Sequence, residues 1–234
     1  MKRVLVVAAH PDDEVLGCGG TMAALAQAGH EVYVLILGEG VTSRDEIRDP
    51  LARAKEIEAL RQAARKAAQI LGAKEVFFED LPDNRFDTVP FLEIVKKIER
   101  IKTKVRPEII FTHYEGDLNI DHQITARAVM TATRPLPGET VNSIYSFEVL
   151  SSTEWNFFTN FKPNVYVDIS KNFSQKIEAF NCYTLENRLF PYPRSEKVLA
   201  SKATVRGSEA GFKFAEAFNL IRENKKLENG QIPF

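Results

Sequence analysis

The sequence has little cysteine, no excess of charge of either sign and no long hydrophobic run. Its two cysteines, Cys18 and Cys182, are far apart and outside any C-x-x-C spacing, which argues against a disulfide framework, a zinc knuckle or a redox pair. The 31 Lys and Arg residues against 32 Asp and Glu residues give a net charge of -1. Without a basic field, neither nucleic acid nor an anionic membrane is favoured. We therefore expect a small-molecule substrate and no nucleic-acid partner.

Hydrophobic residues are 44% of the 234, enough for one domain with a sizeable core, but they never form a membrane-spanning run. The opening stretch "MKRVLVVAAHPDDE" has an apolar part too short for a secretory core, and it leads into acids rather than a cleavage site. These features predict a cytoplasmic protein with no integral membrane segment. A homo-oligomer is compatible with the sequence.

Strand and helix patterns alternate through residues 1–135. A continuous apolar, β-branched run such as "RVLVVAA" is typical of a strand buried on both faces, and apolar residues at helical spacing follow it. Strands are predicted at 3–9, 31–37, 74–78 and 107–113, and helices at 17–29, 50–72, 90–104 and 122–134. This alternation predicts β-α-β crossovers and an α/β, Rossmann-like fold with an open, mostly parallel sheet covered by helices on both faces.

The pattern is looser in residues 136–234. It predicts strands at 144–149 and 164–169, a helix at 171–187, a Pro-rich turn at "FPYPRSE" and a final helical region ending near Lys225. No linker, repeat or low-complexity segment separates this part from the 1–135 core. We expect residues 1–234 to form a single domain, with 136–234 as a C-terminal elaboration packed on the core.

Two polar stretches follow predicted strands at the points where the strands end. "HPDDE" comes after the first strand, and "EGDLNIDH" comes after the fourth. In an open parallel sheet of order 3-2-1-4, ligands bind at the switch point between the first and fourth strands. Residues more than a hundred positions apart are therefore expected to face one crevice.

These stretches contain the ligand types of a metal site. His10, Asp13 and His122 form a two-His, one-carboxylate set with an open position, the arrangement of catalytic zinc, although the same ligands suit Fe²⁺. A bound metal lowers the pKa of water to roughly 7, so a nearby carboxylate can take its proton and deliver hydroxide to a carbonyl. Asp12 is the predicted general base. Asp121 either orients His122 or caps the following helix, and the sequence leaves both roles open.

Two other readings compete with a metal hydrolase. Glycines after the first strand and Glu39 near the end of the second suggest a dinucleotide-binding protein. However, "GCGGT" is not G-x-G-x-x-G, and the acids of "HPDDE" would face the pyrophosphate. The third reading is a metal-binding module without catalysis.

The motifs "AAHPDDEVLGCGGT" and "GDLNIDH" resemble the LmbE-like, or PIG-L, N-acetylglucosaminyl deacetylases. The stretches "LGAKEVFFEDLPDNRFD", "RPEIIFTH" and "RGSEAGFKFAEAF" extend the resemblance over nearly the whole chain. The resemblance implies a Rossmann-like fold, one zinc ion, and removal of the acetyl group from an N-acetylglucosamine-type amino sugar or its conjugate. By motif, it makes His10, Asp13 and His122 the ligands and Asp12 the base.

The sequence departs from the family pattern at Asn119, where many members have histidine. An amide donates hydrogen bonds but cannot act as a general acid near neutral pH. Either Asn119 only polarises the tetrahedral intermediate, or another group, such as Asp12 after it has taken a proton, protonates the amine. The resemblance also implies that Arg61 contacts substrate and that Asp83 holds sugar hydroxyls.

Overall fold

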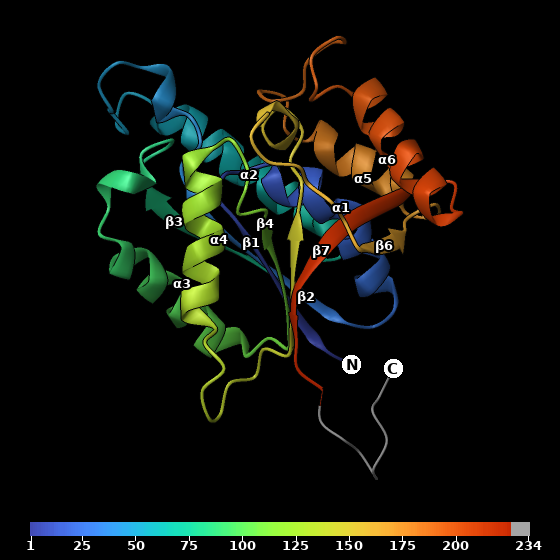
Figure 1. Cartoon of the computed structure of the whole chain (residues 1–234). Coiled ribbons are helices and arrows are strands. Elements are labelled where there is room, and N and C mark those ends of the chain that lie inside the picture. Colours follow the sequence, from blue (N-terminus) through green and yellow to red (C-terminus); the bar gives the residue numbers. More distant parts are fainter. Residues whose placement is uncertain (226–234) are drawn as a thin grey trace.

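Seven strands form one sheet with helices on both faces (Figure 1), which confirms the predicted fold class. This computed structural model describes residues 1–225. The strand order is β3-β2-β1-β4-β5-β7-β6; β7 pairs antiparallel with β5 and β6, and the other pairs are parallel. The strands are β1 (Arg3–Ala8), β2 (Glu31–Gly38), β3 (Glu75–Leu81), β4 (Ile109–His113), β5 (Ser143–Phe147), β6 (Val165–Asp168) and β7 (Ala215–Glu223).

The helices cover the sheet in two layers, each with its own hydrophobic cluster. They are α1 (Asp13–Gln27), α2 (Ala54–Ile70), α3 (Phe91–Val105), α4 (Ile120–Ala132), α5 (Phe173–Asn181) and α6 (Glu196–Ala210), with short 3₁₀ turns at Thr42–Arg44, Phe86–Thr88 and Thr153–Trp155. Alternate β1 side chains enter the two clusters: Val4 and Val6 pack with α1, α2 and α5, whereas Leu5 and Val7 pack with α3 and α4. None of the helices in residues 1–225 combines the length and apolarity that a membrane crossing needs.

The predicted switch point is present. β1 pairs with β2 on one side and with β4 on the other, with Val4 opposite Ile109. The helices that follow these two strands, α1 and α4, pack on opposite faces of the sheet. The loops after β1 and β4 therefore diverge from neighbouring strand ends, at the position where open α/β sheets bind ligands, and this position is called the crevice below.

Both helices at the crevice begin earlier than the sequence pattern predicts. α1 starts at Asp13, inside the acidic motif, and α4 starts at Ile120. The glycines of "GCGG" consequently lie within α1, where a Cβ at Gly17 would come within 2.3 Å of the Phe147 ring. These glycines bring the helix close to the sheet rather than forming a loop.

The predicted final helical region is wrong over residues 215–223, which form β7. Helix α6 ends at Ala210, and the chain turns at Gly211, whose φ is 78°. β7 then pairs antiparallel with β5 and with β6. Backbone pairing on both sides overrides the helix preference of its Ala and Glu residues. β5, β6 and β7 thus extend the same sheet, while residues 226–234 of the predicted C-terminal elaboration lie outside the described residues.

A buried ion pair stabilises a break in α1. The backbone leaves helical geometry at Cys18, with φ -147° and ψ 21°. Glu216 of β7 accepts hydrogen bonds from the backbone N–H groups just after the break, at Gly20 (2.9 Å) and Thr21 (2.7 Å). Lys176 of α5 bonds to Glu216 at 2.6 Å and donates to a carbonyl before the break. The pair therefore satisfies peptide groups that the helix itself leaves open.

Lys176→Met is expected to lower the free energy of unfolding by about 3–5 kcal/mol, because it leaves the Glu216 charge buried without its cation. The matched control is Lys104→Met, since Lys104 and Glu75 form an exposed pair whose loss should cost less than about 1 kcal/mol. Urea denaturation at neutral pH measures both variants. Equal destabilisation by the two substitutions would contradict this role of the buried pair.

Candidate metal and active site

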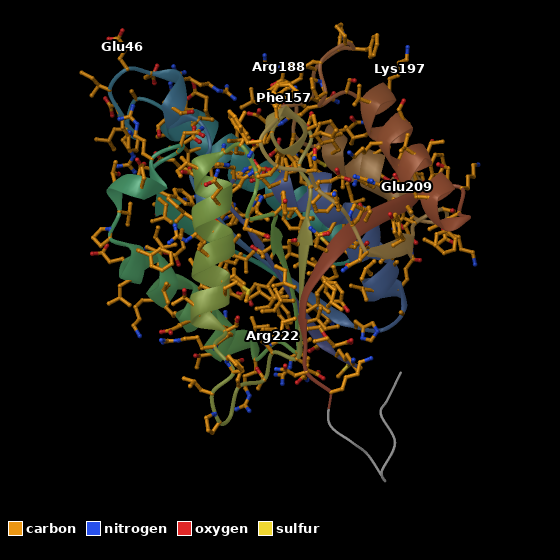
Figure 2. All side chains as sticks on the ribbon, viewed as in Figure 1. Glu46, Phe157, Arg188, Lys197, Glu209 and Arg222 are labelled. Atoms are coloured by element: carbon orange, nitrogen blue, oxygen red, sulfur yellow. The ribbon has the colours of Figure 1, made fainter. Side chains whose placement is uncertain are left out.

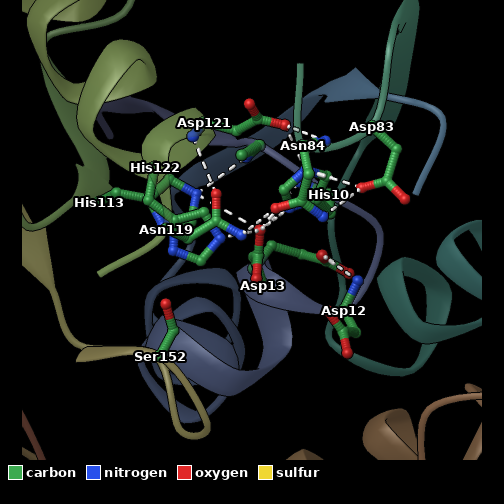
Figure 3. A network of polar contacts seen from close by, with 12 residues as sticks. His10, Asp12, Asp13, Asp83, Asn84, His113, Asn119, Asp121, His122 and Ser152 are labelled. Atoms are coloured by element: carbon green, nitrogen blue, oxygen red, sulfur yellow. Dashed lines mark hydrogen bonds and ion pairs between the residues drawn. The ribbon is translucent and has the colours of Figure 1, made fainter. Parts of the chain in front are cut away.

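The three predicted metal ligands lie close together, with both histidines next to Asp13 (Figure 3). His10 follows β1, Asp13 is the first residue of α1, and His122 lies in the first turn of α4. Asp13 Oδ2 is 3.4 Å from His10 Nδ1 and 3.3 Å from His122 Nε2. One ligand atom from each of the three residues lies within 4.8 Å of the others, close enough to hold one metal ion.

Each imidazole is oriented by a carboxylate on its outer side. His10 Nε2 lies 2.9 Å from Asp121 Oδ2, and His122 Nδ1 lies 3.2 Å from Asp117 Oδ1. A carboxylate there favours the tautomer with its proton on the outer nitrogen. In the neutral rings, the inner nitrogens that face Asp13, His10 Nδ1 and His122 Nε2, are then the ones without a proton, the form that metal binding requires.

Asp121 takes neither of the two roles that the sequence left open. Its carboxylate contacts His10 and accepts backbone hydrogen bonds from Asn84 (2.7 Å) and Phe86 (2.9 Å). The cap of α4 is Asn119, whose Oδ1 accepts from Asp121 N at 2.8 Å. Because α4 begins before Asp121, this residue and His122 are successive helical residues that point about 100° apart. Asp121 therefore supports His10 and not His122.

The charges and open valences of this cluster fit a divalent cation. Asp13 Oδ1 and both ring nitrogens of His122 are buried without a hydrogen-bond partner, although His122 Nδ1 lies 3.2 Å from Asp117 Oδ1. Burial alone would lower the pKa of His122, but the charges of Asp13 and Asp117 raise it to about 9. The cluster thus attracts positive charge, which a metal ion supplies more fully than a proton.

A second set of close ligand atoms belongs to His10, Asp83 and Asp121. Its carboxylates already accept hydrogen bonds, Asp121 from two backbone N–H groups and Asp83 from both N–H and hydroxyl of Ser43. These bonds account for the second set without a metal. In the first set, by contrast, Asp13 Oδ1 has no hydrogen-bond partner, although Asp13 Oδ2 accepts from His10 N at 2.8 Å.

Asp12 lies beside the cluster in a strained conformation. Its φ of 103° is rare for a residue with a side chain, and such strain is concentrated at functional sites. The side chain is fully buried, with Oδ2 bonded to Arg194 Nη1 at 2.7 Å and Oδ1 left without a partner. Burial raises the pKa of Asp12 well above its usual range, although the Arg194 charge opposes the rise. A carboxyl group with a raised pKa is suited to moving protons.

Asn119 and Asp83 also reach the crevice. Because Asn119 Oδ1 caps α4, its NH₂ group faces the other way and donates to Asn84 Oδ1 at 2.9 Å. Asp83 Oδ1 lies 3.3 Å from His10 Nε2, at the edge of the ligand cluster. Both residues therefore lie among the polar groups that surround the predicted ligands.

Arg61 lies apart from this cluster. It projects from α2, pairs with Asp80 and has its guanidinium carbon 5.6 Å from the centre of the Phe78 ring. Within residues 1–225, no hydrogen bond, ion pair or ring contact joins it to His10, Asp13 or His122. Its proposed contact with substrate stays a prediction.

Three residues outside the predicted metal ligands and base also contact the site. His113, at the end of β4, accepts a hydrogen bond from Ala9 N at 2.8 Å and stacks on His122 with 3.9 Å between ring centres. Burial lowers the pKa of His113 well below its usual value, so it is a neutral support. Asp117 lies within "GDLNIDH" and could have been weighed as a partner of His122. Arg194 is a single arginine 182 residues from Asp12, and no local pattern indicates their contact.

The fold and site define a Rossmann-like α/β protein with a switch-point site suited to a divalent cation. The PIG-L family, described as GlcNAc-PI de-N-acetylase, matches residues 5–133, more than half of the chain. The chain belongs to this family.

Relatives of the chain include two kinds of enzyme. It is 27% identical to diacetylchitobiose deacetylase of Thermococcus kodakarensis, over 94% of this chain and 84% of the relative. It is 29% identical to 4-oxalmesaconate hydratase of Pseudomonas putida, over 82% and 76%. The fold is also that of N,N'-diacetylchitobiose deacetylase from Pyrococcus horikoshii, with a TM-score of 0.75 and 23% identity over 94% of this chain and 84% of that structure. Because relatives are named for two reactions, the site must decide between them.

Asp13→Asn is expected to weaken the affinity for a divalent metal by more than about 100-fold. Losing a group that only hydrogen-bonds a metal ligand costs roughly 10- to 100-fold, and Asp13 is itself a predicted ligand. Asp83→Asn should retain the metal, because its carboxylate belongs only to the second set. Elemental analysis after dialysis against a weak chelator measures metal per chain. Loss of metal in Asp83→Asn with retention in Asp13→Asn would place the ion in the second set instead.

Proposed function

We propose that this protein is a zinc-dependent N-deacetylase that removes the acetyl group from an N-acetylglucosamine-type amino sugar or its conjugate. The observation that carries the proposal is the unpartnered, buried Oδ1 of Asp12 beside the His10, Asp13 and His122 cluster. Membership in the PIG-L family and the diacetylchitobiose deacetylase relative support the substrate class.

His10, Asp13 and His122 would hold the zinc ion, which when bound supplies a Lewis acid that acidifies water and polarises a carbonyl. Asp12 accepts the proton of the attacking water at Oδ1. The water oxygen bonds to the acetamide carbon and gives a tetrahedral intermediate. Asp12 returns the proton to the amide nitrogen as the C–N bond breaks, and acetate and a free amine are released.

Asn119 supports the oxyanion in this proposal. The cap at α4 fixes Oδ1, and one hydrogen of the NH₂ group bonds Asn84 Oδ1, so the second hydrogen remains for substrate. A donated hydrogen bond stabilises the negative oxygen of a tetrahedral intermediate. Since an amide carries no transferable proton at neutral pH, the amine is protonated by Asp12. Asp83, next to His10, is proposed to hold sugar hydroxyls, and Arg61 is a more distant candidate for substrate binding.

The ligand set also suits Fe²⁺, and we propose zinc because hydrolysis needs a Lewis acid and no redox change. The dinucleotide reading fits poorly: the N-terminus of α1 carries the buried acids Asp13 and Glu14, where a pyrophosphate would have to lie. Glu39, the candidate ribose partner, is bonded to Arg48 at 2.8 Å. A metal-binding module without catalysis remains an outcome of the activity test.

Hydration of a carbon–carbon double bond is a second candidate, favoured by the 4-oxalmesaconate hydratase relative, which aligns with 82% of this chain. The same carboxylate would take a proton from water and deliver it to one carbon of the double bond, while the hydroxide adds to the other carbon. Loss of ultraviolet absorbance from a conjugated, unsaturated carboxylate would report this reaction, whereas release of free amine reports deacetylation. Running both assays on one preparation separates the two.

Purified protein is expected to release amine from a member of a panel of N-acetylated amino sugars, to lose this activity on chelation and to regain it with Zn²⁺. Restoring Fe²⁺ under anaerobic conditions tests the other metal. If the protein binds one zinc per chain but releases no amine from any sugar of the panel, the result would count against deacetylation. Hydration, or metal binding without catalysis, would then be the candidate functions.

Asp12→Asn should keep its metal but lose roughly 10²- to 10⁴-fold in kcat, the usual contribution of a general acid–base group. The matched control is Asp87→Asn, an exposed acid with the same substitution, which should turn over normally. Steady-state kinetics with metal analysis measures both. Unchanged turnover in Asp12→Asn would remove Asp12 from the reaction.

A further inference from the structure

The turn before α6 places Arg194 in contact with Asp12, the proposed base. This turn lies at the edge of the molecule where Arg188 is labelled in Figure 2. Arg194 at its end donates from Nη1 to Asp12 Oδ2 at 2.7 Å and from Nε to Ser151 Oγ at 2.8 Å. The contact spans 182 residues of sequence and joins the C-terminal part of the chain to the loop after β1.

Arg194 is held in place from several directions. The carbonyl of Arg194 accepts a hydrogen bond from Arg188 N at 3.1 Å, which closes the turn. Its Nη1 lies 3.4 Å from Glu186, which in turn pairs with Arg44 from the loop after β2. The next residue, Ser195, caps α6 through its side chain. A guanidinium fixed by its backbone and by two neighbours has little freedom to leave Asp12.

The contact with Arg194 makes the two carboxylate oxygens of Asp12 different. Oδ2 is occupied by Arg194, whereas Oδ1 is buried and has no partner. The backbone of Asp12 is fixed as well, because its N–H donates to Glu14 Oε2 at 3.1 Å. With the backbone and one oxygen fixed, the carboxylate plane has one orientation.

We propose that Arg194 is a positioning residue that aims Asp12 Oδ1 at the reacting water. The inference rests on the proposed function, since it assigns Arg194 a part in that reaction. Only 18% of the Arg194 side chain is exposed, so the contact takes a guanidinium largely out of water. A planar guanidinium can bond Asp12 and Ser151 through different nitrogens at fixed angles, which a lysine ammonium cannot reproduce.

Arg206 offers a matched control. It is a similarly buried arginine of the same C-terminal part, with 12% of its side chain exposed, and it bonds Glu148 through Nε at 2.7 Å. It makes no hydrogen bond or ion pair with Asp12 in residues 1–225. Its removal should therefore test the general cost of losing a buried arginine pair.

The test compares Arg194→Ala with Arg206→Ala in the zinc-loaded enzyme. Arg194→Ala should lose roughly 10- to 100-fold in kcat, as for other outer groups that orient a metal centre, with KM and zinc content within about twofold of the parent. Added guanidinium should restore part of its kcat, and Arg194→Lys should be less active than the parent. Arg206→Ala should keep its kcat and not respond to guanidinium.

Three results would overturn the proposal. If the kcat of Arg194→Ala equals or exceeds that of the parent, Arg194 only neutralises the charge of Asp12 and does not position it. Equal loss in Arg206→Ala, without rescue in either variant, would assign the loss to folding. Crystal structures of the parent and Arg194→Ala, both with zinc, give a readout that needs no turnover: the Asp12 carboxylate should rotate in the variant, and an unchanged carboxylate would refute its positioning. Failure of the amine-release panel with the parent would instead count against the proposed function.

Discussion

Three consecutive buried carboxylates at the end of β1 are the constraint on which the rest of the site depends. Asp12 and Asp13 are fully buried, and Glu14 is 3% exposed. An ion moved out of water costs several kcal/mol unless partners surround it. Each carboxylate therefore needs its own partner: the imidazoles face Asp13, Arg194 bonds Asp12, and the Tyr183 hydroxyl donates to Glu14.

These partners come from segments far along the chain, so the fold must bring them to one point. β4 and α4 supply His113 and His122 because β4 lies beside β1 in the sheet. The C-terminal part supplies the partners of Asp12 and Glu14, and it is anchored beneath them by the Lys176–Glu216 pair, which bonds to the peptide groups around the break in α1. The C-terminal elaboration thus completes the electrostatics of the motif as well as extending the sheet.

The site combines short local motifs with partners from distant segments, and this difference explains which features the sequence could predict. The order of the first four strands, the switch point and the grouping of His10, Asp13 and His122 follow from local periodicity and short motifs. The role of Asp121 could not be predicted, because it depends on α4 starting at Ile120, and boundaries are the weakest part of a pattern. β7 is stabilised by two neighbouring strands, and the Arg194 contact spans 182 residues, so neither leaves a local signal.

The same physics bears on how one chain has relatives named for deacetylation and for hydration. In the two reactions proposed above, a proton leaves water, and they differ in whether it is delivered to nitrogen or to carbon. In this chain Asn119 cannot deliver a proton, so under the proposed mechanism Asp12 must both take it and return it. The outcome then depends on which substrate atom lies within reach of Asp12 Oδ1. That geometry is governed by Arg194 and the loops around it, outside the "HPDDE" motif, and the motif alone therefore defines the site without defining the reaction.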